Sequence, residues 1–286
     1  MKRASEVQAT VVMRARNDMP IIRRTLDGLA AQRGLTWDLI ALDNASTDGT
    51  RELLEERGAR VLDVPEGGYN PGRVLNWGVR EARADVLVML NSDTVPLGQR
   101  WLADLTEPLR GGEADAVYGR QVPRADATTL VRIDYAQAFG AEPPPWRPFF
   151  SMAASAFRRS VLLERPFSEA VQYSEDLEWA RDAEQRGLRI RYVPGAAAEH
   201  SHNYTLRETW KRFFEEGRAD AAIFPPGERP LRVGRTLAGV VRDVARDVPA
   251  CLLSRDGASL VCSPLVRTLQ RVGYVAGRLK GPRVLG

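Results

Sequence analysis

The chain has 286 residues, 44% hydrophobic and 27% charged, a balance typical of a folded protein with a sizeable buried core. Its basic residues gather at one end: residues 229–286 carry 11 Lys and Arg against 3 Asp, a net charge of +8, which leaves −4 for residues 1–228. This asymmetry argues against a nucleic-acid partner, because a general nucleic-acid binder interleaves basic and aromatic residues over its main domain.

The sequence predicts neither export nor a membrane span. The apolar run at residues 9–13 is too short for the core of a signal peptide, and no later stretch approaches the length of a transmembrane helix. The two cysteines, Cys251 and Cys262, have neither CxxC spacing nor a neighbouring histidine pair, so they indicate no metal or redox role. These features favour a reduced, cytoplasmic setting.

The first 96 residues alternate between patterns of strand and helix. Apolar and β-branched runs predict strands over residues 8–15, 37–43, 59–64 and 86–90. Helical spacing of apolar residues follows Pro20, the loop 44–50 and the flexible stretch 65–72. Strands that alternate with helices in this way predict βαβ units and a mostly parallel sheet.

The pattern is less regular after Pro96. Helices are predicted over residues 101–109, a short segment ending at 164, 174–186 and 204–217, and strands over 114–122, 149–157 and 188–193, with an extended run over 195–202. Residues 126–139 and 143–146 are expected to form surface loop and acceptor-side structure. We expect a catalytic domain over residues 1–227, with a nucleotide-binding half (1–96) and an acceptor half (97–227), followed by a basic helical extension over 228–286.

The turn after the first strand, residues 13–18, excludes several nucleotide-binding folds. It contains neither the G-x-G-x-x-G of dinucleotide-binding oxidoreductases nor the G-x-x-x-x-G-K-[ST] of P-loop enzymes. The glycine-rich loop expected of a sugar-nucleotide pyrophosphorylase is also missing from this turn.

Acidic and polar residues follow two predicted strands. Asp43 ends the second strand, and the apolar run 86–90 passes directly into Asn91, Ser92 and Asp93. Because parallel sheets bind ligands beyond the carboxyl ends of their strands, the fold would place Asp43 and Asp93 on one rim. The alternative is local: a helix cap or Asx turn at Asp43, and a simple turn at residues 91–93.

Glu175 and Asp176 open the predicted helix 174–186. Acids are favoured in the first turn of a helix by its dipole, with Ser174 as the cap, and this explanation needs no function. A carboxylate there can also take a proton from a sugar hydroxyl. The residues themselves leave both interpretations open.

His200 and His202 are the only two histidines of the chain. In an extended segment their side chains face the same side, about 7 Å apart. A structural role is common for a histidine, but two on one segment near an acidic rim indicate a metal site equally well. A carboxylate with an imidazole suits Mn²⁺ or Mg²⁺ on phosphates better than a structural zinc, which takes four protein ligands.

Together these motifs resemble the inverting family 2 glycosyltransferases of the GT-A fold, and within them the bacterial rhamnosyltransferase-like branch. The resemblance extends over residues 8–220 and rests on six motifs in order: Arg14–Asp18, Leu42–Thr50, Arg73–Gly78, Leu90–Pro96, Ser174–Trp179 and Glu199–Tyr204. It implies an α/β fold with a Rossmann-like, mostly parallel sheet flanked by helices and a C-terminal helical extension.

The resemblance implies roles for three groups of residues. Asp93 matches the last aspartate of the DxD-type metal motif, whose first aspartate is Asn91 here, so a histidine ligand becomes more necessary: His200, with His202 as its substitute or as a diphosphate contact. Asp176 resembles the catalytic base, and Glu175 is its rival. The nucleotide-sugar pocket would comprise Arg14, Arg16, Asn17, Asp43, Asn44, Arg73, Asn76, Asn91 and Ser92, with Asp43 on the base or ribose.

The implied activity is transfer of a sugar, rhamnose or another hexose, from a dTDP-, UDP- or GDP-linked donor to a glycan or lipid-linked hydroxyl in polysaccharide biosynthesis, assisted by Mn²⁺ or Mg²⁺. The alternative is a catalytically silent relative that acts as a scaffold or binds a membrane surface. The tail mixes apolar residues with arginines, so two partners remain open for it. It could lie on the inner face of the cell membrane, or pack on the catalytic domain or on a second subunit in a homodimer.

Overall fold

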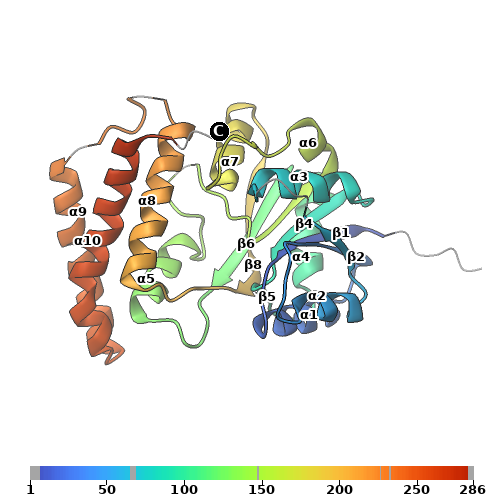
Figure 1. Cartoon of the computed structure of the whole chain (residues 1–286), viewed down its shortest axis with the longest axis horizontal. Helices are drawn as coiled ribbons and strands as arrows, with labels where there is room; N and C mark the ends of the chain where they lie inside the picture. Colours follow the sequence, from blue (N-terminus) through green and yellow to red (C-terminus); the bar gives the residue numbers. More distant parts are fainter. Residues whose placement is uncertain (1–6, 65–68, 147, 226, 232, 283–286) are drawn as a thin grey trace, which may run out of the picture. The chain divides into compact units, whose positions relative to one another are not determined.

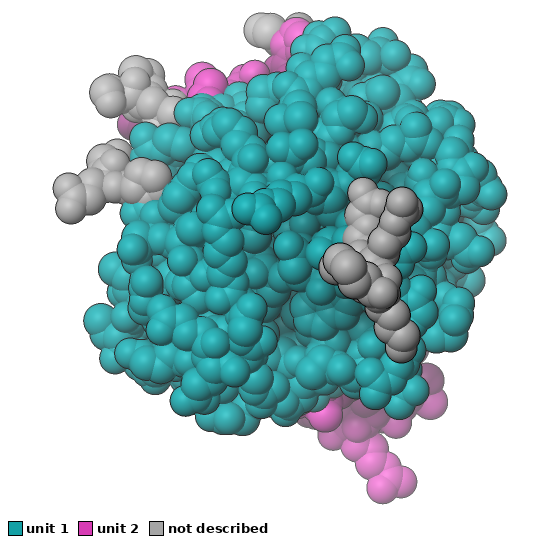
Figure 2. All heavy atoms as spheres, turned by 90° about the vertical axis from the view of Figure 1, so that its right-hand side faces the viewer, with its two compact units in different colours: residues 1–122, 139–169, 175–200 teal, residues 123–138, 170–174, 201–286 magenta. Residues whose placement is uncertain are grey.

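The computed structural model describes residues 7–64, 69–146, 148–225, 227–231 and 233–282. Within the stretch that we expected to be flexible, residues 65–68 lie outside this description. The chain forms two compact units, residues 1–122, 139–169 and 175–200 in the first and residues 123–138, 170–174 and 201–286 in the second, which Figure 2 colours separately.

The first unit contains a single mixed sheet (Figure 1). Its strands are β1 (Ala9–Ala15), β2 (Trp37–Asp43), β3 (Arg60–Asp63), β4 (Val86–Asn91), β5 (Val95–Pro96), β6 (Ala116–Val122), β7 (Ala154–Arg158) and β8 (Ile190–Glu199). They lie in the order β3-β2-β1-β4-β7-β6-β8-β5. β1 pairs in parallel with β2 and β4, β2 with β3, and β6 with β8, whereas β7 and β5 run antiparallel to their neighbours.

Helices bury both faces of this sheet. On one face lie α1 (Ile21–Ala30), α2 (Thr50–Glu56) and α4 (Trp101–Arg110), and on the other lie α3 (Pro71–Glu81), α6 (Arg159–Glu164) and α7 (Glu175–Gln185). Successive residues of β1 point to opposite faces, so Val11 and Met13 join one hydrophobic core while Val12 joins the other. Burial on both sides explains why these strands are continuous apolar runs, which is the feature that predicted them.

The second unit consists of helices: α5 (Thr129–Ala138), α8 (Leu206–Ile223), α9 (Val233–Leu253) and α10 (Gly257–Lys280). The basic tail is therefore helical, as the sequence predicted. α8 and α10 approach closely through glycines: a Cβ at Gly217 would lie 2.1 Å from the carbonyl oxygen of Tyr274, and one at Gly277 would lie 2.0 Å from that of Phe214. None of the described helices is long and apolar enough to cross a membrane.

Several predicted elements need correction. Residues 129–138, expected as loop, form α5, because residues more than 120 positions away stabilise it: Thr129 N donates to Asp256, and Arg267 binds Asp134. The strand expected over 149–157 begins only at Ala154. The two extended runs expected over 188–193 and 195–202 are one strand, β8, with an irregularity opposite Gly119–Arg120. α8 continues to Ile223, beyond the expected end at residue 217.

Candidate active site

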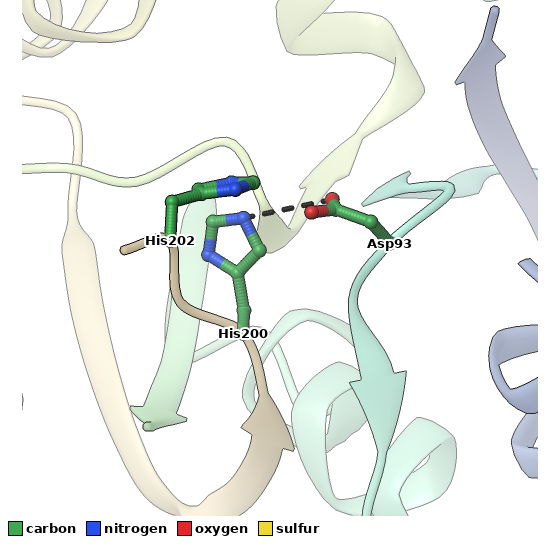
Figure 3. A group of neighbouring side chains, drawn as sticks. All are labelled: Asp93, His200 and His202. Atoms are coloured by element: carbon green, nitrogen blue, oxygen red, sulfur yellow. Dashed lines mark ion pairs between the residues drawn. The ribbon is translucent and has the colours of Figure 1, made fainter. Parts of the chain in front are cut away.

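A short strand pairing brings Asp93 next to a histidine more than 100 positions away. After β4, a turn closed by Thr94 N donating to Asn91 O leads into β5, where Val95 pairs antiparallel with Glu199 of β8. Asp93 lies two residues before Val95 and His200 one residue after Glu199, so the pairing brings their side chains together, with 3.6 Å between Asp93 Oδ1 and His200 Nε2 (Figure 3). The turn expected at residues 91–93 exists, and it also presents a carboxylate to an imidazole.

The other side of the His200 ring is held by Gln121. His200 Nδ1 lies 2.8 Å from Gln121 Oε1, and the amide nitrogen of Gln121 lies 2.6 Å from Ser151 Oγ. With the amide nitrogen donating to Ser151, the carbonyl oxygen of Gln121 faces the ring and accepts the Nδ1 proton. In this tautomer the lone pair of Nε2 points toward Asp93, as a metal-ligating histidine requires.

His202 follows two residues later and completes a group of three candidate ligands. Asp93, His200 and His202 each offer one ligand atom, and these atoms lie within 4.8 Å of one another (Figure 3). Two ligands about 2.1 Å from one ion lie about 3–3.5 Å apart, so the spacing of Asp93 and His200 is close to what a shared ion needs. One carboxylate and two imidazoles are a donor set that could hold a divalent metal ion.

Asp18 contacts the turn that carries Asp93, although it was not among the predicted site residues. Its Oδ2 accepts hydrogen bonds from Ser92 Oγ, at 2.6 Å, and from Arg16 N. Burial raises the pKa of Asp18, and the nearby charge of Asp93 adds to the rise. The signal that could have revealed it is strand order: Asp18 follows β1, and β1 pairs with β4, whose end carries Ser92.

Glu175 and Asp176 lie at the same edge of the sheet but in different surroundings. Glu175 is 8% exposed and accepts from Arg14 Nη1 at 2.8 Å. Asp176 is half-buried, and Met152 N and Leu177 N donate to its carboxylate. Burial raises the pKa of Asp176 to about 6; the charge of Glu175 adds to the rise, and the two backbone hydrogen bonds and Arg14 oppose it. The preceding Ser174 has a φ of 60°, unlike the extended backbone expected of a capping serine.

The tripeptide Ser151–Ala153 connects these groups. Ser151 Oγ binds Gln121, which holds His200, and the next residue donates its backbone N–H to Asp176. One residue further, Ala153 O accepts from Asn91 N. These residues precede β7 instead of extending it. Their polar groups are therefore available both to the candidate metal site formed by Asp93, His200 and His202, which we call the metal corner, and to the carboxylates of Glu175 and Asp176.

The loops after β1 and β2 are bonded to each other around Asp43. This aspartate is 1% exposed and accepts from both the N–H and the hydroxyl of Ser46. Ser46 Oγ in turn accepts from Asn17 N, and Asn17 Oδ1 accepts from Thr47 N. Asn44 N donates to the carbonyl oxygen of Ala15, the last residue of β1.

The remaining predicted nucleotide contacts differ in accessibility. Arg16 is exposed in the β1–α1 loop, and Arg73 is half-buried in the first turn of α3. Asn76 is 4% exposed, and its amide both donates to Phe167 O and accepts from Phe167 N. That pairing fastens α3 to the segment before α7 and leaves Asn76 little capacity for a ligand.

The fold is that of the GT-A glycosyltransferases. The chain is similar to the mannosyltransferase PcManGT of Pyrobaculum calidifontis, solved in complex with GDP-Man and Mn²⁺, with a TM-score of 0.68 and 19% identity, over 96% of this chain and 86% of that one. This likeness confirms the predicted GT-A fold with its C-terminal helices.

Residues 10–165, more than half of the chain, match the model of Glycosyl transferase family 2, and the protein belongs to that family. It is 29% identical over 192 residues to the O-antigen chain rhamnosyltransferase WbaN of Salmonella anatum, covering 63% of this chain and 61% of WbaN. It is 27% identical over 229 residues to RfbN of Salmonella typhimurium, which has the same description, covering 74% of this chain and 72% of RfbN. The match thus spans less than two thirds of WbaN. These relatives confirm the predicted resemblance to the rhamnosyltransferase-like branch.

Proposed function

We propose that the protein transfers a hexose or deoxyhexose, such as rhamnose, from a nucleoside-diphosphate donor to a glycan or lipid-linked hydroxyl, with inversion at the anomeric carbon. The observation that carries the proposal is the carboxylate of Asp176, whose raised pKa suits proton transfer near neutral pH, beside a candidate metal corner. The names of the relatives support rhamnose as the sugar.

Asp176 is the base in this proposal. It is more accessible than Glu175, and Glu175 is engaged in the ion pair with Arg14. An ionised Asp176 takes the proton of the acceptor hydroxyl. At the same time the hydroxyl oxygen attacks the anomeric carbon of the donor sugar, and the bond from that carbon to the diphosphate breaks. Glu175 and Arg14 act on the charge and position of Asp176, so we assign them a positioning role.

Asp93, His200 and His202 would hold a divalent ion, Mn²⁺ or Mg²⁺. When bound, such an ion neutralises the charge that grows on the departing diphosphate. The contribution of the chain is to fix the donors: Gln121 orients His200, and the β5–β8 pairing sets the position of Asp93.

The nucleotide would bind at the ends of β1, β2 and β4, where Asp43 and Asn44 meet the base or ribose. Arg16, Asn17 and Arg73 would line the rest of this pocket, with Arg14, Asn91 and Ser92 at its border with the metal corner. We give Asn76 a structural role because its amide pairs with Phe167.

A donor screen tests the proposal. The full chain is incubated with Mn²⁺ and dTDP-, UDP- and GDP-sugars, and release of the nucleoside diphosphate is measured with a panel of glycan and glycolipid acceptors. We expect release with one donor class, a product one sugar heavier, and an NMR coupling that shows the opposite anomer. Retained configuration would exclude single displacement. Failure of every donor to bind would favour the catalytically silent scaffold.

A further inference from the structure

The helices α9 and α10 present apolar residues to the solvent. On α9 the exposed fractions are 63% for Leu237, 70% for Val241, 60% for Leu252 and 87% for Leu253, and Val248 is exposed as well. On α10 they are 79% for Val261, 49% for Leu265, 40% for Val272 and 76% for Leu279. Apart from the neighbours Leu252 and Leu253, successive positions are four or seven residues apart, so they form a stripe along the outer side of each helix.

The inner sides of the same helices are polar. Arg267, 2% exposed, forms an ion pair of 2.7 Å with Asp247, which is fully buried. Ser263 Oγ also donates to Asp247, and Arg271 binds Asp243. A helix pair in water normally buries its apolar residues and exposes its ion pairs. α9 and α10 depart from this pattern, because they bury the Arg267–Asp247 pair and expose the apolar side chains named above.

The packing of α10 against α8 includes close approaches of the two backbones. Gly273 and Gly277, four residues apart on α10, let the backbones of α8 and α10 come close. Small residues at this spacing typically join helices whose other sides face a nonpolar medium.

The charges on the outer sides have one sign. Arg242 is 77% exposed at its side chain, and Arg255 and Lys280 are exposed as well. The described part of the two helices and the turn between them contains three acids, and each is at most half-exposed. Asp243 pairs with Arg271, Asp247 pairs with Arg267, and Asp256 accepts from Ser259 N. A second copy related by a two-fold axis would bring like charges together, whereas an anionic lipid surface complements them.

We propose that α9 and α10 form an interfacial binding surface for an anionic lipid bilayer. The outer stripes lie in the plane of the membrane at the boundary between headgroups and acyl chains, and Arg242, Arg255 and Lys280 contact lipid phosphates. This mode needs no spanning helix. It is independent of the proposed reaction, because a chain without transferase activity would still bind the bilayer.

Vesicle co-sedimentation of the full chain tests the proposal. We expect the protein to pellet with phosphatidylcholine vesicles that contain phosphatidylglycerol, and to pellet about tenfold less with pure phosphatidylcholine or in high salt. Absence from the pellet with every vesicle composition would overturn the proposal.

Variants locate the surface. The double variant Val241→Gln/Leu252→Gln removes apolar side chains from the stripe without changing charge, and Arg242→Gln/Arg255→Gln removes two cations; each should weaken binding about tenfold or more. The matched control Leu97→Gln/Leu163→Gln changes exposed leucines of the first unit and should bind like the unmodified chain. All these positions are exposed, and circular dichroism verifies that each variant is folded. Equal binding by all variants would place the lipid contact elsewhere.

Cys262 separates a bilayer from a second copy of the chain. It is exposed beside Val261 on α10, whereas Cys251 is buried, so a polarity-sensitive fluorophore can be attached at Cys262 alone. We expect a blue shift on adding anionic vesicles and quenching by a quencher in the acyl chains. A blue shift without lipid, together with a dimer in light scattering, would assign the surface to a second copy and overturn the proposal.

Discussion

Glu175 and Asp176 are neighbours in sequence but have different hydrogen-bond partners. Glu175 forms an ion pair of 2.8 Å with the guanidinium of Arg14. Asp176 has two backbone N–H donors, yet burial and the charge of Glu175 keep its pKa near 6. Two adjacent carboxylates with different surroundings can therefore divide a positioning role and a proton-accepting role between them.

The variants Asp176→Asn and Glu175→Gln distinguish these roles. Asp176→Asn should lower kcat by about 10²–10⁴-fold and leave donor affinity nearly unchanged. Glu175→Gln should keep most activity at pH 7.5, because the base remains ionised. Calorimetry with the donor and steady-state rates provide the measurements. The reverse result, an active Asp176→Asn and an inactive Glu175→Gln, would move the base to Glu175.

The pH profile gives an independent check on Asp176. A base must be ionised, so a pKa near 6 predicts that kcat/KM falls about tenfold per pH unit below about pH 6. In Glu175→Gln the neighbouring negative charge is gone, so the pKa of Asp176 decreases and the fall in rate should move to lower pH. The same acid limb in both proteins would show that Glu175 does not act on the titrating group.

Asp93 is the carboxylate on which the proposed metal site depends. Asp93→Asn removes the charge from one of the three candidate ligands. Mn²⁺ affinity, followed by electron paramagnetic resonance in the presence of the nucleotide, should fall about 10–100-fold or more. As a control, Asp104→Asn changes a partly exposed acid of α4 and should leave the Mn²⁺ affinity unchanged. Equal Mn²⁺ binding by Asp93→Asn would remove this residue from the site.

At the scale of the elements, the parts that could be predicted are those with their own sequence pattern. β1, β2 and β4 follow from continuous apolar runs because both faces of the sheet are buried. The pairing of β5 with β8 has no such signal, since β5 contains only Val95 and Pro96. That pairing brings Asp93 to His200, so the sequence could nominate both residues but could not show that they meet. The same limit hid Asp18 and Gln121, whose importance comes from neighbours far along the chain.

Gln121 on β6 provides a test of how elements support the site. Gln121→Leu removes the acceptor for the Nδ1 proton of His200 while keeping a similar volume, and should weaken Mn²⁺ binding about 10–100-fold, a typical effect of losing the second partner of a metal-bound histidine. Gln121→Glu keeps an acceptor for the Nδ1 proton and should bind Mn²⁺ more tightly than Gln121→Leu does. Normal Mn²⁺ affinity in Gln121→Leu would show that the ring is oriented by other contacts.

At the scale of the whole molecule, the two units are stabilised in different ways. The first has a double-faced sheet with apolar cores, whereas the second relies on close helix contacts and buried ion pairs, such as that of Arg267 with Asp247. Breaking a buried pair of this kind leaves an unpaired charge, and filling a tight helix contact forces backbones apart. The second unit should therefore be sensitive to single changes that leave the first unit folded.

Gly217→Val tests this independence. The new side chain would meet the carbonyl oxygen of Tyr274, already 2.1 Å from an ideal Cβ, and should lower the unfolding free energy of the second unit by about 3 kcal/mol. Cys251 is 1% exposed in that unit, so its reaction with a thiol reagent should begin at a lower denaturant concentration than in the unmodified chain. Binding of the nucleotide, whose proposed contacts all lie in the first unit, should persist at that concentration. Gly257→Ala is the matched control, because its Cβ would meet nothing within 4 Å. Simultaneous loss of thiol protection and nucleotide binding in Gly217→Val would mean that the two units unfold as one.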